Sequence, residues 1–291
     1  MKISQITFVA SMLLAMSCSY AQDSNIPQAK YTAHNKGKFF VSWGGNRETF
    51  TNSDIHFTGE NYNFTVHNAM AQDKPKGWHI DYLNPSRITI PQTNFKMGYF
   101  FSDQYSISIG VDHMKYVMKQ NQTALITGTI NLPASESGSA YNGIYSLNSD
   151  NNPIDFTDGT FLQFEHTDGL NYIHTEIARF ADISNWFGIR NTDKIQINFT
   201  EGLGAGFIYP KTNTVLLGKT RHDDFHISGY GVSAKAGLNL TFLKHFYVQG
   251  EFKYGYINMN DIRTTQSAAD KASQHFNFFE RIVAVGGIFK L

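Results

Sequence analysis

Hydrophobic and polar residues alternate with a period of two along most of the chain from Lys38 onward, and this period is typical of β-strands. In the closing stretch "HFNFFERIVAVGGIFKL", residues 275–291, one side of the strand carries Phe279, Val283, Val285, Phe289 and Leu291, and the other carries Glu280, Ala284, Gly286, Ile288 and Lys290. The alternation predicts eight strands: Lys38–Phe50, Arg87–Phe101, Tyr105–Lys119, Gly169–Asp182, Lys194–Tyr209, Phe225–Phe242, Phe246–Ile262 and the closing stretch. Pro91 predicts a bulge or an edge position within the second strand.

The connections between these strands alternate in length. Short segments follow the second, fourth and sixth strands: "SDQ", "ISNWFGIRNT" and "LKH". Longer polar segments follow the others, and the largest are residues 51–86 and 120–168. This asymmetry is typical of transmembrane β-barrels, whose turns are short on the periplasmic side and whose loops are long outside the cell.

The pattern therefore predicts an all-β fold, an eight-stranded antiparallel transmembrane up-and-down β-barrel with short periplasmic turns and long extracellular loops. The last strand is expected to close on the first, because lipid tolerates no unpaired strand edge. Apolar side chains then face lipid and polar ones face the interior. A soluble β-sandwich or a lipocalin-type barrel gives the same alternation with the opposite sidedness, and alternation alone does not separate the two.

The N-terminal stretch "MKISQITFVASMLLAMSCSYAQ" predicts a secretory signal peptide. It has one basic residue, a short apolar core, and small residues before a cut after Ala21, and its apolar run is too short to span a bilayer comfortably. The predicted organisation is a signal peptide at 1–21, a periplasmic segment at 22–37 and the barrel at 38–291. Lipidation of Cys18, the single cysteine, is an alternative, although the preceding residues fit a lipoprotein signal poorly.

Composition adds little about partners but agrees with a barrel. The chain has 24 basic and 24 acidic residues, so its net charge gives no case for nucleic acid as a partner. Its 24 glycines, 15 tyrosines and 24 phenylalanines suit many strands flanked by aromatic residues. We expect no cofactor.

The predicted signal peptide, the eight alternating strands and the aromatic final strand together resemble small outer-membrane β-barrel proteins of the Bacteroidota, which are Gram-negative bacteria. The stretch "WGGNRETFTNSDIHFTGENYNF" is similar to one in that group. The resemblance implies an outer-membrane location, contact with outer-membrane lipid and lipopolysaccharide, and recognition by the barrel assembly machinery. It lends no firm biochemical function. The chain ends in Phe289-Lys290-Leu291 and not in the aromatic residue that many such barrels present to that machinery.

Charged residues on the small-residue faces of the strands are expected to line the lumen. They are Lys96, Glu176, Lys235, Glu251, Lys253 and Glu280, and Asp112 and His174 are expected to join them. Eight strands leave no open pore, so these charges should pair and plug the interior. A conduit or a proton-linked site is the alternative.

Some outer-membrane barrels are lipid A deacylases or acyltransferases, which place a histidine, a serine and an acid near the outer leaflet. Candidate catalytic residues of that kind are Asp112, His113, His174 and Glu176, and we identify no His-x-Ser pair on a predicted strand. Candidate metal ligands are His222, Asp223, Asp224 and His226 in "RHDDFH". In both cases a structural role of the polar groups is the competing interpretation.

Aromatic residues are frequent in the two longest connections: Tyr62, Phe64, Trp78, Tyr82, Tyr141, Tyr145, Phe156 and Phe161. They predict either an exposed recognition surface for an extracellular ligand or rings that pack on one another. The stretch "NYNFTVH" within this set alternates and predicts a surface hairpin or an extension of the first strand. We expect a monomeric barrel with a plugged lumen and a role in surface interaction or envelope integrity. An outer-leaflet lipid-modifying hydrolase and a small transport barrel remain alternatives.

Overall fold

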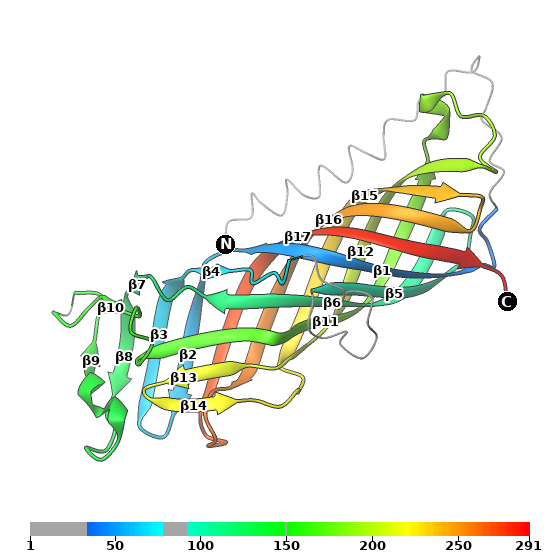
Figure 1. The fold of residues 1–291 in the computed structure, drawn as a ribbon. Coiled ribbons are helices and arrows are strands. Elements are labelled where there is room, and N and C mark those ends of the chain that lie inside the picture. Colours follow the sequence, from blue (N-terminus) through cyan, green and yellow to red (C-terminus); the bar gives the residue numbers. More distant parts are fainter. Residues whose placement is uncertain (1–33, 78–91, 149) are drawn as a thin grey trace. The chain divides into compact units, whose positions relative to one another are not determined.

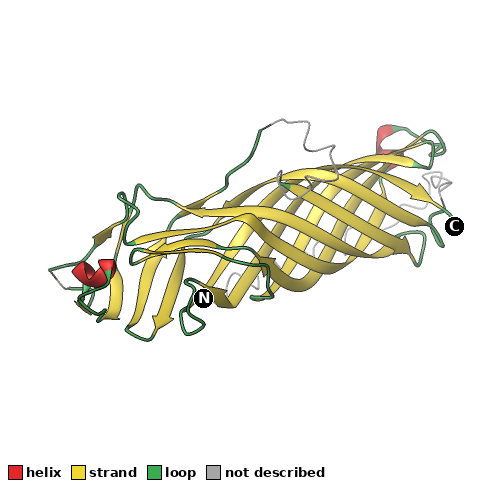
Figure 2. Cartoon of the chain, turned by 60° about the horizontal axis from the view of Figure 1, so that its bottom comes forward, coloured by secondary structure: helices red, strands yellow, loops and turns green. Residues whose placement is uncertain are grey.

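Eight long antiparallel strands form a closed ring in the computed structural model, which describes residues 34–77, 92–148 and 150–291 (Figures 1 and 2). In ring order they are β1 (Phe39–Phe50), β5 (Thr93–Phe100), β6 (Tyr105–Met118), β11 (Leu162–Asp182), β12 (Ile195–Pro210), β15 (Gly229–Phe242), β16 (Phe246–Arg263) and β17 (Lys271–Phe289). Trp43 of β1 faces Phe95 of β5 on one side and Val285 of β17 on the other, so the last strand closes on the first. The fold is an eight-stranded up-and-down β-barrel, as the sequence predicts.

The first, third, fifth and seventh predicted strands match the observed ones within one residue at each end, and the eighth begins earlier than predicted, at Lys271 and not at His275. The fourth begins earlier than predicted, at Leu162 and not at Gly169, and the sixth begins later, at Gly229 and not at Phe225. The part of the second predicted strand from Arg87 to Pro91 lies outside the described residues, as do the predicted signal peptide and most of the segment 22–37.

The short connections all lie at one end of the ring, the short-turn end. Leu243 and Lys244 have φ values of 52° and 66°, which makes the connection from β15 to β16 a tight turn of the mirror-image type that hairpins favour. The turn from β5 to β6 is closed by Ser102, whose hydroxyl accepts hydrogen bonds from the backbone N–H groups of Gln104 and Tyr105 at 3.3 and 2.9 Å. The predicted short turns are therefore confirmed.

Most outward side chains of the barrel are apolar, and many of them are exposed. Ile109, Leu203, Phe252 and Val283 each expose between 59% and 66% of their surface. A continuous outer belt of this kind belongs in contact with hydrocarbon, as on bilayer-spanning strands. Helices in the described residues are limited to the short 3₁₀ turns Ser137–Tyr141 and Ser184–Phe187. None of the described helices is long or apolar enough to cross a bilayer.

At the other end of the ring, much of the described chain continues as further strands, which we call the extension. It comprises β2 (Ser53–Gly59), β3 (Tyr62–Ala69), β4 (Ala71–Gln72), β7 (Thr123–Ala124), β8 (Ile126–Ile130), β9 (Gly143–Tyr145), β10 (Ile154–Asp155), β13 (Asn213–Leu216) and β14 (Lys219–His222), with the adjoining ends of β6, β11, β16 and β17. The long connections predicted at this end are present, and much of their described length pairs as short strands. β2 and β3 form the hairpin that the alternation in "NYNFTVH" predicts.

The extension continues two sides of the ring. On one side β17 pairs with β2, and β3, β8 and β9 follow in order. On the other side β11 pairs with β13, and β13 pairs with β14. Rings from the two sides meet in the middle: Phe57 lies 5.8 Å from Phe164, and Tyr116 lies 5.0 Å from Phe276, measured between ring centroids. The extension thus encloses an apolar core of its own.

The loop aromatic residues belong to this core. Tyr62, Phe64, Tyr145, Phe156 and Phe161 are all at most 5% exposed, and Tyr141 packs against the same cluster. Packing of the rings on one another is therefore the correct interpretation for these residues, and an exposed recognition surface built from them is wrong. Trp78 and Tyr82 lie outside the described residues.

Candidate functional site in the barrel lumen

Four charged residues from four different strands meet in the lumen near its middle. Lys96 of β5 lies 3.0 Å from Glu176 of β11 and 3.4 Å from Glu251 of β16, measured from Nζ to the carboxylate oxygens. Lys235 of β15 lies 2.7 Å from Glu176 and also pairs with Glu251. All four side chains are at most 9% exposed. Each lysine therefore bridges both glutamates across the interior.

A second group lies next to the first and contains the other two predicted lumen charges. Lys253 of β16 pairs with Asp112 of β6, and its Nζ lies 3.8 Å from the Glu280 carboxylate. The Asn94 amide donates to Asp112 at 2.6 Å and to Glu280 at 2.8 Å. Asn46 of β1 donates to the same Glu280 oxygen at 2.8 Å. These amides supply donors that the carboxylates need once water is excluded.

His174 completes this second group, because its Nε2 lies 3.1 Å from Asp112 and 3.5 Å from the Lys253 ammonium. Across both groups three lysines face four carboxylates, so His174 is the remaining group among them that can carry positive charge. Its side chain is fully buried. The structure thus gathers all the predicted lumen residues into these two neighbouring groups, which we call the charge network.

His113 is separate from that network, although it follows Asp112 directly. Successive residues of a strand point to opposite faces, and His113 Nδ1 instead contacts the side-chain oxygen of Asn171 on β11 at 2.7 Å. Of the four candidate catalytic residues, the structure therefore brings together Asp112, His174 and Glu176 but not His113. All four are at most 3% exposed, so a lipid or solute does not reach them in this conformation.

Aromatic layers close the lumen above and below the charges. Towards the extension, the ring of Tyr172 lies 4.6 Å from His174 and 6.2 Å from Phe278, and it joins the apolar core described above. At the short-turn end a separate cluster contains Phe40, Phe100, Phe180, Tyr247, Ala178 and Ile288. Its rings are in contact, with Phe100 centred 5.2 Å from Phe40 and 5.1 Å from Phe180.

Sequence reasoning missed both aromatic layers and the two asparagines. The signal was present, because Phe40, Phe100 and Phe180 occupy inward positions of predicted strands. A polar interior is thus only the middle level of the lumen, between two apolar ones.

The candidate metal ligands do not converge on a common point in the structure. Asp223 is fully buried and accepts hydrogen bonds from Arg221 at 3.1 and 2.6 Å, while Asp224 is exposed. Only His226 approaches Asp223, at 3.1 Å, and the side chain of His222 lies outside the described part of the structure. No group of three or more potential metal ligands occurs among the described residues.

The same segment contains a serine beside a histidine and an acid. His226 Nε2 lies 3.0 Å from Ser228 Oγ, and its Nδ1 lies 3.1 Å from Asp223. The sequence reading that finds no His-x-Ser pair on a predicted strand is therefore wrong, since His226-Ile227-Ser228 is one. However, Nε2 also lies 2.8 Å from the backbone oxygen of Asp261. A carbonyl oxygen only accepts, so Nε2 carries a proton there and cannot take one from the serine.

Ser228 is also only 2% exposed. The arrangement thus ties the segment before β15 to β16 and does not activate the hydroxyl for attack.

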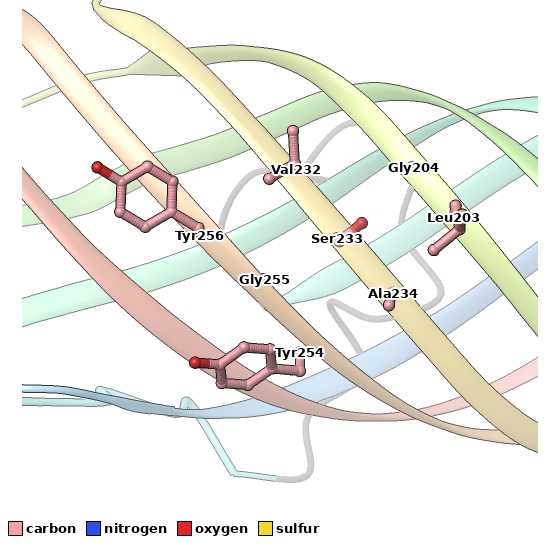
Figure 3. A pocket seen from close by; sticks show the side chains of 8 residues that line it. All are labelled: Leu203, Gly204, Val232, Ser233, Ala234, Tyr254, Gly255 and Tyr256. Atoms are coloured by element: carbon pink, nitrogen blue, oxygen red, sulfur yellow. The ribbon is translucent and has the colours of Figure 1, made fainter. Parts of the chain in front are cut away.

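One apolar hollow lies on the outer surface of the barrel, across β12, β15 and β16, with a volume of about 360 Å³ (Figure 3). Exposed Leu203, Val232 and Tyr254 border it, and small residues such as Gly204 and Gly255 form its floor. It faces away from the charge network, so it is part of the apolar belt and does not lead into the lumen.

No protein-family model matches the chain, and no curated protein matches it. Among solved structures, the outer membrane protein AlkL in lipid bilayers is 11% identical, with 93% of this chain and 98% of that chain covered and a TM-score of 0.43. The outer membrane protein OprG from Pseudomonas aeruginosa is 10% identical, with 89% of this chain and 98% of that chain covered and a TM-score of 0.38. The attachment invasion locus protein Ail of Yersinia pestis is 10% identical, with 87% of this chain and 99% of that chain covered and a TM-score of 0.32.

Proposed function

We propose that this chain is an outer-membrane β-barrel that is closed to solutes and holds a folded β-structure, the extension, above the outer leaflet. The observation that supports it is the packing of the lumen at three successive levels, namely the aromatic cluster at the short-turn end, the charge network and the apolar core of the extension. A barrel filled in this way acts as an anchor and not as a pore. Its role is then surface interaction or envelope integrity.

The membrane placement is supported by the sidedness of the strands. Apolar residues face outward around the barrel, while the buried charges face inward, which is the reverse of a soluble barrel. The predicted signal peptide at 1–21 supplies export, and the short turns would then face the periplasm. Lipopolysaccharide and outer-membrane lipid would contact the belt, and the assembly machinery would insert the barrel.

Conductance in planar bilayers tests the closed lumen. We expect the purified full chain to insert without steady current at any applied voltage, with a general porin as the positive control. A sustained open current would overturn the closed barrel and favour the transport alternative.

Cysteine labelling of intact cells tests the orientation, because Cys18 is the only native cysteine and lies in the predicted signal peptide. Glu60→Cys places a thiol at the tip of the β2–β3 hairpin, and Asn191→Cys places one at the short-turn end; both positions are exposed. We expect a membrane-impermeant maleimide to label Glu60→Cys in intact cells and Asn191→Cys only after lysis. The reverse result would contradict the proposed placement.

The hydrolase alternative is tested at Ser228, where a serine, a histidine and an acid come together. Because Ser228 is buried and His226 Nε2 is engaged by Asp261, we expect a fluorophosphonate probe to leave the protein unlabelled. We also expect Ser228→Ala to leave the lipid A mass spectrum of the cells unchanged. Labelling that disappears in Ser228→Ala would establish the hydrolase.

A further inference from the structure

Two arginines face each other on the outside of the barrel. Arg47 of β1 and Arg281 of β17 are direct cross-strand partners in the β1–β17 ladder. Arg281 is exposed and Arg47 is half-buried, while their chain neighbours Glu48 and Glu280 point inward and are buried. Like charges directly opposite each other destabilise a strand pair. An anion placed between the two guanidinium groups would offset this repulsion.

No described residue supplies that anion. Neither arginine makes an ion pair with a carboxylate of the described residues, and the nearby outward positions of β16 and β17 carry no Asp or Glu. On the other flank of β1, the Asp73 carboxylate accepts hydrogen bonds from the backbone N–H of Glu48 at 3.2 Å and from the Gln92 amide at 2.5 Å. One N–H of Arg47 donates to the backbone oxygen of Asn46. A guanidinium has five N–H donors, so most of the donors of the pair are available to a ligand.

Another outward arginine of the barrel is neutralised by a carboxylate of the same chain. Arg179 of β11 faces Glu201 of β12 in the same register relation, and the two side chains form an ion pair at 3.2 Å. The chain thus neutralises Arg179 internally and leaves Arg47 and Arg281 facing each other.

The surroundings of the pair are apolar. On the short-turn side lie Val283, Val285 and Trp43, and on the other side lies Phe279, which stacks on Phe252 with 5.7 Å between ring centroids. Arg281 precedes the end of β17 at Phe289 by eight residues, and Arg47 follows the start of β1 at Phe39 by eight residues. Both arginines therefore stand in the outer part of the belt, where long side chains extend to the lipid headgroups.

We propose that Arg47 and Arg281 together bind the phosphate group of a lipid in the outer leaflet. Two forked guanidinium groups match the oxygens of a phosphate, which can bridge them and remove their repulsion. This inference rests on the proposed membrane placement.

A shallow groove on the same strands favours a lipid over a free phosphate. The groove, of about 400 Å³, lies nearer the short-turn end and is bordered by Phe246, Val248, Val285 and Gly287. It lies on the β16 and β17 surface four to six residues from Arg281, about 13 to 20 Å along the strand. An acyl chain that hangs from a phosphate at the arginines would run along this apolar surface into the groove.

Native mass spectrometry of the detergent-solubilised full chain tests the site with a matched set of probes. Dioleoyl phosphatidic acid carries a phosphate, dioleoylglycerol is the same lipid without it, and inorganic phosphate is the group without the lipid. We expect the wild-type chain to retain phosphatidic acid in preference to dioleoylglycerol, and an equal concentration of inorganic phosphate not to displace it. We expect Arg47→Gln with Arg281→Gln to weaken retention by about tenfold or more, and Arg179→Gln, the matched control, to retain it like the wild type.

A charge reversal provides a second variant that keeps the fold. Arg281→Glu would give Arg47 a facing carboxylate, like the one that Arg179 has in Glu201. We expect it to raise the thermal unfolding temperature of the barrel and to abolish the preference for phosphatidic acid.

Equal retention of the two lipids by the wild type, or undiminished binding in the double variant or in Arg281→Glu, would overturn the site. Displacement by inorganic phosphate would overturn the assignment to a lipid. A chain that inserts closed and correctly oriented in the experiments above and still fails here would overturn the arginine site alone.

Discussion

The barrel and the extension are built from the same strands with opposite sidedness. Along β17, the outward residues of the extension are Lys271, Ser273, His275 and Asn277, whereas those of the barrel include Phe279, Val283, Val285 and Phe289. The inward residues change in the other direction, from Phe276 and Phe278 to Glu280. β16 repeats the change, from inward Ile257 and Met259 to inward Lys253 and Glu251.

The comparison shows that a strand does not need a bend or a bulge to pass from one solvent to another. The alternation continues unbroken from His275 to Phe289, and only the identity of the residues on each face changes. The extension behaves as a soluble β-structure with an apolar interior and a polar surface. The barrel has an apolar surface that suits lipid, and its interior stays stable because its charges are paired.

Replacement of Lys253 by Met should give the largest effect, because Lys253 is fully buried and neutralises Asp112 and Glu280. Its loss leaves carboxylates buried without a partner, and we expect the free energy of unfolding to fall by about 4 kcal/mol. Urea titration of vesicle-reconstituted protein measures it. The control is Lys271→Met, which removes a half-exposed pair with Asp261. A similar loss in both variants would show that the lumen charges do not act as a buried network.

A cavity in the apolar core of the extension should lower its free energy of unfolding. Phe276→Ala removes a ring that contacts Tyr116 and Phe50 and is only 2% exposed. We expect a loss of about 3 to 4 kcal/mol in the same titration. If the extension unfolds independently of the barrel, the loss will appear as a separate early transition. A loss below about 1 kcal/mol would mean that this core is not tightly packed.

Acid should weaken the extension through His166, a fully buried residue of β11 whose Nδ1 contacts Thr212 at 2.9 Å. Burial lowers the pKa of His166 to about 4 from its ordinary value of 6.5. The unfolded chain therefore takes up a proton at a higher pH than the folded chain. The contribution of His166 to the free energy of unfolding is fully present above about pH 6.5, and it falls by about 3 kcal/mol as the pH drops to 4.

His166→Gln keeps a hydrogen-bonding side chain that does not titrate. We expect the difference in unfolding free energy between the wild type and this variant to change by that amount between pH 7 and 4. A difference that does not vary with pH would show that His166 is solvated.

Two substitutions on the outward face of β17 should sharpen the boundary between the regions. Val283→Arg places a charge on the belt, where Val283 is 66% exposed, and should cost about 2 to 3 kcal/mol in a bilayer. His275→Arg makes a similar change on the exposed outer face of the extension and should cost less than about 0.5 kcal/mol. The ratio of folded to unfolded protein in vesicles measures both. Equal costs would place the two residues in the same solvent.

Several features of the site followed from the sequence. Lys96, Glu176, Lys235, Glu251, Lys253 and Glu280 were placed inside because they share strand faces with small and polar residues, and the structure buries all six. Their pairing, for example of Lys235 with Glu176, could not be predicted, because it depends on the stagger between neighbouring strands. His113 lies apart from these residues because adjacent residues of a strand face opposite sides.

The strand pairing of the extension does not follow from the sequence, apart from the hairpin predicted in "NYNFTVH". Its strands are short, and their polar residues, such as His56, Thr58 and Asn63, resemble loop composition. Phe57 and Phe64 show their role only when β2, β3 and β11 come together around them. A segment of seven or eight residues does not by itself reveal which strand covers it.

The local pattern of residues is enough to specify the eight long strands, their alternating faces and the short turns, because the two-residue period and the turn residues act within a few positions of each other. Only the tertiary structure decided which face meets which solvent at each height, how the lumen charges pair, and that Arg47 faces Arg281 across the closing seam. These properties join residues as far apart as β1 and β17, and local patterns carry no information about register between them.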